Sequence, residues 1–271
     1  MKGQNSILDV LYEEPGPKTK KRIKIFSMLS FAFVVLFVLL ILKQFYVTGQ
    51  FNARYWRFFV KPTTWSFLGA GLLGTVRVAL TSAVITFLLG FLMMFGRVRG
   101  GKVVNFLSMA FIEFTRGVPT LLFIYFFFFA MPAFGIKMSS FWKITIPVAV
   151  SASGAVAEVL RGGINAVHKG QREAALSLGF SENRTFFKIL FPQAFKFVIP
   201  SLIAELVIVL KDTTFAYVVS FNDLMQNSSV LISNYDALLS VYLVTAIIYI
   251  IINYLLNKLS VSLALKKKLK K

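Results

Sequence analysis

Six long apolar segments limit what this chain can fold into more than any other feature. Crossing a hydrocarbon core of about 30 Å takes roughly 20 residues of α-helix, because backbone N–H and C=O groups cannot stay unpaired in lipid. Six segments approach that length: Phe26–Tyr46, Phe67–Phe95, Phe106–Met131, Phe141–Leu160, Phe197–Leu210 and Ala237–Leu259. The sequence therefore predicts an all-α integral membrane protein with about six transmembrane helices. Pro119 and Pro200 make the third and fifth the least regular.

The composition supports a protein embedded in lipid. The chain is 57% hydrophobic, contains 30 Phe, and has a mean hydropathy of +0.73, which is too apolar for a soluble domain of 271 residues. The first apolar segment follows a polar tail of 25 residues, and no small-residue cleavage site comes after it. We therefore expect it to be a retained helix and not a signal peptide.

The positive charge of the chain indicates its orientation in the membrane. The net charge of +19 could suggest nucleic-acid binding, but that function needs cations gathered on a water-exposed face beside stacking aromatic rings. Here the cations occupy short loops. With the N-terminus inside, the cytoplasmic segments hold 21 Lys and Arg residues and the external segments hold five. Since cytoplasmic loops retain cations, both termini are predicted to be cytoplasmic, with attraction to anionic lipid and no nucleic-acid partner.

Small residues separate a peripheral helix from a packed core. The second apolar segment carries small residues at helical spacing, which let helices approach closely in lipid: Gly71, Thr75, Ala79 and Ala83. The first segment has almost none, so we expect it to face lipid. The predicted organisation is a cytoplasmic tail (1–25), a peripheral transmembrane helix (26–46), a transmembrane domain with a cytoplasmic loop (67–260, loop 161–196) and a basic cytoplasmic tail (261–271). With no Cys and a single His, no metal or cofactor site is expected.

The long loop between the fourth and fifth apolar segments has the pattern of two short helices joined by a glycine. Gln171–Leu178 is rich in helix formers, with Glu173 placed in its first turn. Gly179 suits a left-handed terminator, Ser181 can cap a second helix through about Leu190, and Pro192 can begin the next helix.

This helix–Gly–helix element is expected to present small residues beside aromatic ones. The small residues are Ala174 and Ala175, and the aromatic ones are Phe180, Phe186 and Phe187. A compact apolar surface displayed to the cytosol indicates docking to a partner protein. An amphipathic helix resting on the lipid surface is the other interpretation that the residues leave open.

The loop also carries a resemblance to a known family. The stretch EAALSLGFSENRTFFKILFP resembles the permease signature of binding-protein-dependent, ATP-driven importers. The matching positions are Glu173, Ala174, Ala175, Gly179, Ile189 and Pro192. Phe191 stands where the family usually has Leu, which we expect to alter packing without abolishing docking.

Four further stretches are similar to polar-amino-acid permeases. They are GLLGTVRVAL, FIEFTRGVPTLLFIYFFFFAMP, AEVLRGGINAV and VLKDTTFAYVV, so that the likeness extends over roughly Gly71 to Leu259. The N-terminal DVLYEEPGPK, followed by an extra helix, is similar to glutamate-importer permeases of Gram-positive bacteria.

The resemblance implies a fold, partners and a function. The fold is a five-helix type I ABC importer core with an extra N-terminal helix and a cytoplasmic coupling helix, in the plasma membrane of a bacterium. The partners are cytoplasmic ATPase subunits, a second permease that is identical or homologous, and an extracytoplasmic binding protein. The function is ATP-driven uptake of a polar amino acid, with a glutamate-type substrate suggested by the N-terminal likeness. The permease itself is not an enzyme, because ATP and Mg²⁺ are bound by the ATPase.

Within that resemblance, the loop is the element that couples the permease to the ATPase. The residues implied are Glu173, Ala174, Ala175, Gly179, Phe180, Ile189 and Pro192. Glu173 would make polar contacts with the ATPase, the two alanines would allow close approach, and Gly179 would set the bend.

The segment Gly96–Lys102 is a near match to a phosphate-binding loop, but Val103 replaces the Ser or Thr that Mg²⁺ requires.

Ionisable residues at membrane depth are candidates for the transport pathway, because they are costly to bury. They are Arg77, Glu113, Arg116, Glu158 and Glu205. A structural role is also open for two pairs, since Glu113 and Arg116, and likewise Glu158 and Arg161, are spaced i,i+3 and can neutralise each other. Arg77 has no acid nearby on its own helix, so it is the first candidate for contact with a substrate carboxylate.

Two other functions remain open at this point. A channel or secondary transporter independent of ATP would also need intramembrane charges and broken helices, but it has no use for the coupling-like loop. A membrane enzyme acting on lipid would require a cluster of nucleophile and base, which the sequence does not indicate.

Overall fold

The computed structural model describes residues 16–268, which form helices with no strand among them. Residues 1–15 of the expected N-terminal tail and 269–271 of the basic tail lie outside the described residues. The chain divides into two compact units, Met1–Trp56 and Arg57–Lys271. Across the described residues, five helices are long and apolar enough to cross a membrane, or six if one bent pair counts as a single span. This agrees with the predicted fold class.

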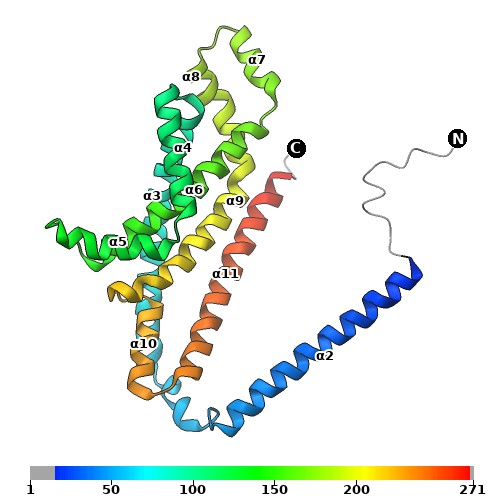
Figure 1. Cartoon of the computed structure of the whole chain (residues 1–271), viewed down its shortest axis with the longest axis vertical. Helices are drawn as coiled ribbons and strands as arrows, with labels where there is room; N and C mark the ends of the chain where they lie inside the picture. The colour runs from blue at the N-terminus through cyan, green and yellow to red at the C-terminus, as the bar shows by residue number, and fades with distance from the viewer. Residues whose placement is uncertain (1–15, 269–271) are drawn as a thin grey trace. The chain divides into compact units, whose positions relative to one another are not determined.

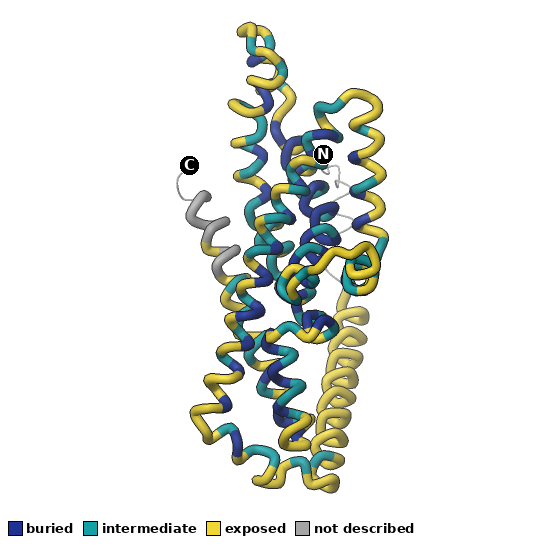
Figure 2. Tube along the Cα trace, turned by 90° about the vertical axis from the view of Figure 1, so that its left-hand side faces the viewer, coloured by how far each residue is buried: buried dark blue, intermediate teal, exposed yellow. Residues whose placement is uncertain are grey.

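The first unit consists of helix α2 (Pro17–Val47) and a short 3₁₀ turn, η1 (Ala53–Tyr55). Helix α2 has no buried residue in its described length, as its yellow tube in Figure 2 shows. It begins at Pro17, nine residues before the predicted start at Phe26, because a proline is tolerated in the first turn, where its missing N–H has no helical partner. Part of the expected cytoplasmic tail is therefore helical.

The second unit contains the remaining elements (Figure 1). They are η2 (Arg57–Val60), α3 (Pro62–Arg99), α4 (Lys102–Gly117), α5 (Thr120–Ala133), α6 (Ser140–Ala166), α7 (Lys169–Ser177), α8 (Glu182–Thr185), η3 (Phe186–Leu190), α9 (Phe191–Asp212), η4 (Thr213–Val219), α10 (Leu224–Tyr235) and α11 (Leu238–Lys268). Helices α7 and α8 lie at one end of this unit, and α10 lies at the opposite end (Figure 1).

Helix α6 is the centre of the core, and α3, α4, α5 and α9 pack against it. Small residues make this possible, since Ala149, Ser153 and Ala157 are fully buried in α6, and much of its tube is dark in Figure 2. On α3, the hydroxyl groups of Ser82 and Thr86 donate hydrogen bonds to carbonyl oxygens of α6 at 3.1 and 3.2 Å. The small residues of α6 therefore lie in the packed core, whereas Gly71 and Thr75 of the predicted α3 stripe contact the segment at the start of α10 (Leu224–Tyr235).

The third predicted span, Phe106–Met131, is a broken helix. Helices α4 and α5 meet at an angle of 101° between Gly117 and Thr120. Pro119 explains the break, because it lacks an N–H and disfavours helical backbone at the preceding residue. At the break, Thr120 donates a hydrogen bond to Asp212 of α9 at 2.7 Å and its hydroxyl lies 3.0 Å from that of Ser151 on α6.

The fifth predicted span, Phe197–Leu210, is longer and more regular than expected. Helix α9 runs from Phe191 to Asp212 without interruption at Pro200. The expected external loop after it contains a helix that was not predicted, α10, whose N-terminus is capped by the Asp223 side chain accepting from the Gln226 N–H at 2.7 Å. Helix α10 packs on α3 at Gly71, where an added Cβ would lie 2.7 Å from the Asp223 carbonyl oxygen.

Candidate functional site

The first short helix of the loop begins earlier than its sequence pattern indicates. Helix α7 starts at Lys169, and the His168 ring nitrogen Nδ1 caps it by accepting the Gly170 N–H at 3.1 Å. The predicted start at Gln171 was wrong, because the His168 side chain caps the helix and lets it begin two residues earlier. As a result Glu173 lies beyond the first turn, and the expected interaction with the helix dipole there is also wrong.

Gly179 ends α7 in the left-handed conformation, as predicted. Its φ is +77°, and no atom lies within 4 Å of an added Cβ. The Gly179 N–H donates to the Leu176 carbonyl at 2.9 Å, and the Phe180 N–H donates to the Ala175 carbonyl at 3.1 Å. This pair of bonds is the Schellman motif, which reverses the chain tightly at the end of a helix.

The second short helix is shorter than predicted. Ser181 caps it as expected, accepting the Arg184 N–H at 3.4 Å, but α8 covers only Glu182–Thr185. The chain then widens into a π-helical turn, η3, in which the Phe191 N–H donates to the Phe186 carbonyl five residues earlier. Pro192 lies in the first turn of α9, where it was predicted.

Exposure separates the loop residues into two groups. Glu173 and Ala174 are exposed, and Leu178 is 78% exposed. Ala175 is only 5% exposed and Phe186 only 1%, so both pack inside the chain. The expected display of Ala175 and Phe186 was therefore wrong, and the Phe186 ring completes the core beside Met94 and Ile112. Phe180 is half-buried, with the Arg184 guanidinium 5.7 Å from its ring centre.

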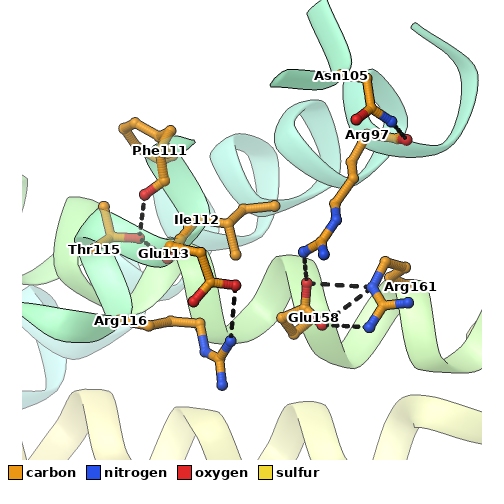
Figure 3. A network of polar contacts seen from close by, with 9 residues as sticks. All are labelled: Arg97, Asn105, Phe111, Ile112, Glu113, Thr115, Arg116, Glu158 and Arg161. Atoms are coloured by element: carbon orange, nitrogen blue, oxygen red, sulfur yellow. Dashed lines mark hydrogen bonds and ion pairs between the residues drawn. The ribbon is translucent and has the colours of Figure 1, made fainter. Parts of the chain in front are cut away.

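Glu158 is the centre of a charged cluster between α3 and α6 (Figure 3). Arg161 donates to it from the next turn of α6, with an Nη2–Oε2 distance of 2.7 Å, as the i,i+3 spacing predicted. Arg97 of α3 also donates to Glu158, which the sequence did not indicate. Two guanidinium groups thus surround one carboxylate that is 20% exposed.

A second charged pair lies on α4, close to the first (Figure 3). Glu113 and Arg116 are 3.6 Å apart, and their side chains are 60% and 46% exposed. The Arg116 side chain passes over Gly154 of α6, where an added Cβ would lie 3.1 Å from its Cγ atom. With Arg97, the two pairs bring together three Arg and two Glu, so that this part of the surface carries one excess positive charge.

The last two pathway candidates are separate from this cluster. Arg77 lies on an exposed stripe of α3 with Leu73, Leu80 and Val84, and it forms no ion pair among the described side chains. Glu205 of α9 lines a small pocket of about 70 Å³ whose other walls are mostly apolar, including Phe87, Val156 and Leu202. The structure therefore brings together Glu113, Arg116 and Glu158 but not all five candidates.

The near match to a phosphate-binding loop does not form such a loop. Gly96 and Arg99 belong to the last turn of α3, and Arg97 is engaged with Glu158. Phosphate loops instead present backbone N–H groups from a glycine-rich turn before a helix.

Comparison with known proteins gives a consistent group. Residues 86–266 match the family described as "Binding-protein-dependent transport system inner membrane component". The chain is 30% identical to the glutamate transport system permease protein GluD of Corynebacterium glutamicum, over 78% of this chain and 79% of that protein. It is 32% identical to the probable glutamine ABC transporter permease protein GlnP of Bacillus subtilis, over 71% of this chain and 89% of that protein.

A solved structure shares the fold. A crystal structure of an amino acid ABC transporter with histidines superimposes with a TM-score of 0.70 and 27% sequence identity, covering 74% of this chain and 94% of that one. The MetNI methionine ABC transporter in an inward-facing form has a TM-score of 0.60 at 15% identity, which supports the fold alone.

Proposed function

The chain belongs to the inner membrane components of binding-protein-dependent transport systems, and from this premise we propose which role each of its parts has in uptake. It is a permease subunit of an amino-acid ABC importer, a multi-pass membrane protein with the type I importer fold. The observation that carries the proposal is the α7–Gly179–α8 turn, which matches the family signature and leaves Glu173, Ala174 and Leu178 exposed at one end of the bundle.

We propose that this turn docks into a separate ATPase subunit. The exposed Ala174 allows close approach and Glu173 offers a charge, while the buried Ala175 holds α7 to the rest of the loop. The permease lacks an ATP site of its own, and it works with a second permease subunit and with a binding protein that delivers the amino acid from outside. The family description supports the binding protein, and the apolar helix faces support a membrane setting.

The docking role requires the turn to be in the cytoplasm, with both termini there as well. The distribution of cations predicts this orientation. We expect reporters inserted near Arg184 to report the cytoplasm, and reporters near Asp236, in the turn between α10 and α11, to report the outside. An external location for Arg184 would place the turn out of reach of any ATPase and would contradict the proposal.

The substrate is proposed to be a polar amino acid of the glutamate type. GluD is named as a glutamate permease, and the cluster of Glu113, Arg116, Glu158, Arg97 and Arg161 has one excess positive charge. Glutamate has one ammonium group and two carboxylates, so its net negative charge complements that excess. Arg116 is the most exposed guanidinium of the cluster and is placed to meet a carboxylate.

Arg77 is proposed as a second contact for a substrate carboxylate. It is fifteen residues after Pro62, about 22 Å along α3 at 1.5 Å per residue, and its stripe is exposed in the single chain. A second permease subunit packed beside this stripe would enclose Arg77 in the pathway between the two.

We expect Arg77→Ala to reduce the rate of ATP-driven glutamate uptake by about tenfold or more, since hydrogen bonds to charged groups contribute about 1.5–3 kcal/mol. Uptake of labelled glutamate into proteoliposomes measures the effect, with Leu80→Ala on the same exposed stripe as the control. Normal uptake by Arg77→Ala would leave Arg77 with a structural role only.

A further inference from the structure

Glu182 connects three helices that come from separate parts of the chain. It is the first residue of α8, and its carboxylate accepts from Arg99 at the end of α3 at 3.2 Å. The same carboxylate accepts from Arg172 of α7, whose Nε lies 3.3 Å from Oε2 and whose Nη2 bonds to Oε1. Asn183 adds a second bond to Arg99, at 3.2 Å. A single side chain, 37% exposed, therefore links α3, α7 and α8.

Below this link, aromatic rings join α3 to the turn that follows α8. Phe95 of α3 lies 5.2 Å from Phe186 and 5.5 Å from Phe187, measured between ring centres. Phe91, one turn earlier, lies 5.0 Å from Phe191 with the two rings nearly perpendicular. Such contacts stabilise packing beyond the area they bury. Phe191 is the position where the family resemblance expects Leu, and its ring extends this aromatic contact.

The α7–α8 turn has two covalent connections to the membrane helices. Two residues, Val167 and His168, connect α6 to α7, and η3 continues directly into α9. Helix α3 has no such connection, because it ends about 70 residues before α7 begins. Any movement of α3 with the turn must therefore pass through non-covalent contacts. The aromatic rings reach η3 and α9, whereas Glu182 also reaches Arg172 on α7 itself.

We propose that Glu182 is a positioning residue that makes α3 move together with the α7–α8 turn. The inference rests on the proposed docking of that turn to an ATPase, and it adds α3 to the two helices that the turn moves through the backbone. When the ATPase displaces α7, the paired guanidinium groups of Arg172 and Arg99 carry the displacement through one carboxylate to the end of α3. Helix α3 bears Arg77 on its exposed stripe and packs along the core helix α6, so its movement changes the pathway.

A purely local role for Glu182 gives a different expectation. An acidic residue in the first turn of a helix is favourable by itself through the helix dipole. If Glu182 acted only through the helix dipole, replacing Arg99 and Arg172 would have little effect on stimulation of ATP hydrolysis. Exchanging the charges would then not restore the stimulation that Glu182→Gln had lost. The proposed link between Glu182 and the two arginines, in contrast, needs opposite charges on its two sides, and either side can carry the negative charge.

The experiment uses the full importer in proteoliposomes with its ATPase and binding protein. Glu182→Gln is compared with a charge-exchanged variant, Glu182→Arg with Arg99→Glu and Arg172→Glu, and with the control Lys188→Gln, which removes an exposed charge from η3. Coupling between distant sites typically changes equilibria by about 5- to 150-fold, so we expect Glu182→Gln to reduce the stimulation of ATP hydrolysis by loaded binding protein about fivefold or more. Retention of the ATPase in a pull-down should be unchanged, and the charge-exchanged variant should recover most of the stimulation.

A distance measurement tests the movement directly. The chain contains no Cys, so spin labels can be placed at Val98→Cys on α3 and Ser177→Cys on α7 without removing other thiols. With Glu182 present, we expect the same distance with and without trapped ATP, and with Glu182→Gln we expect the distance to change between the two states.

The outcomes separate this inference from the docking proposal. If Glu182→Gln kept the wild-type stimulation of ATP hydrolysis and the same spin-label distance in both states, the proposed role of Glu182 alone would be overturned, provided that the wild-type chain retains the ATPase. Loss of the ATPase from the pull-down in that variant would also overturn it, because Glu182 would then be part of the docking surface. A wild-type chain that retains no ATPase would contradict the docking proposal itself.

Discussion

We expect Gly179→Val to remove most of the stimulation of ATP hydrolysis by loaded binding protein, while the chain still inserts into the membrane at near-normal abundance. Gly179 has a φ of +77°, in the left-handed region, which costs a residue with a Cβ roughly 1–2 kcal/mol and a β-branched residue more. No atom lies within 4 Å of the added Cβ, so the penalty comes from the backbone conformation and not from a collision.

The chain can relieve this penalty only by opening the turn. The two hydrogen bonds of the Schellman motif, from Gly179 to Leu176 and from Phe180 to Ala175, would then be lost. The second helix would point away from α7, and the surface that contains Glu173 and Ala174 would lose its shape. The membrane helices are held by separate packing around α6, so they should remain folded.

Gly135→Val is the matched control for this prediction. Gly135 follows α5 with a φ of +74°, and an added Cβ there also has no neighbour within 4 Å. The two variants therefore carry the same kind of backbone strain at different places. We expect Gly135→Val to keep nearly full stimulation of ATP hydrolysis. Equal losses in both variants would mean that general strain, and not the shape of the α7–α8 turn, causes the defect.

The second large effect is expected from Gly154→Val, which should separate α4 from α6. An added Cβ at Gly154 would lie 2.8 Å from the carbonyl oxygen of Ile112 and would collide with the Thr115 hydroxyl. A backbone carbonyl cannot rotate away, so one helix must move. Overpacking a core typically costs about 1–3 kcal/mol, and the branched Val side chain adds atoms beyond the Cβ.

Displacing α4 should also affect uptake, because the Arg116 side chain lies over Gly154. We expect a clearly lower midpoint of thermal unfolding in detergent and a loss of glutamate uptake. Gly162→Val, on the same helix, makes the same change where no atom lies within 4 Å of the added Cβ. That control should unfold close to the wild-type temperature. Similar unfolding temperatures for the two variants would show that close packing at Gly154 is not needed.

Features that depend on neighbouring residues in the chain could be predicted from the sequence. The apolar segments, the left-handed Gly179, the Ser181 cap and the helix start at Pro192 all appear in the structure. Each follows from local chemistry: a span from its hydropathy, a cap from a hydroxyl that accepts an N–H, and a turn from the freedom of glycine. The Glu113–Arg116 and Glu158–Arg161 pairs were predicted for the same reason, since each lies within one helical turn.

Features set by distant contacts could not be predicted in this way. Arg97 and Glu158 are 61 residues apart in the chain, and Arg99 and Glu182 are 83 apart, so no local spacing indicates either pair. The early end of α8 depends on burying Phe186 against α3. The size of the bend after α4 is likewise set by packing, although Pro119 indicated that the helix would be irregular.

Helix α10, which was not predicted, has one local signal in the sequence. Asp223, a favoured N-cap residue, directly precedes Leu224 and Met225, which is a pattern for the start of a helix. This segment was predicted only as part of an external loop. Its contact with Gly71 of α3 explains why it is ordered in the structure, and it could not be inferred without the fold.

The most direct test of the central claim is ATP hydrolysis by proteoliposomes that contain the wild-type chain and its ATPase, measured together with accumulation of labelled glutamate. The account predicts that loaded binding protein stimulates hydrolysis, and that accumulation requires ATP, the ATPase and the binding protein together. Accumulation that proceeds without the ATPase, or hydrolysis that never responds to loaded binding protein, would contradict it.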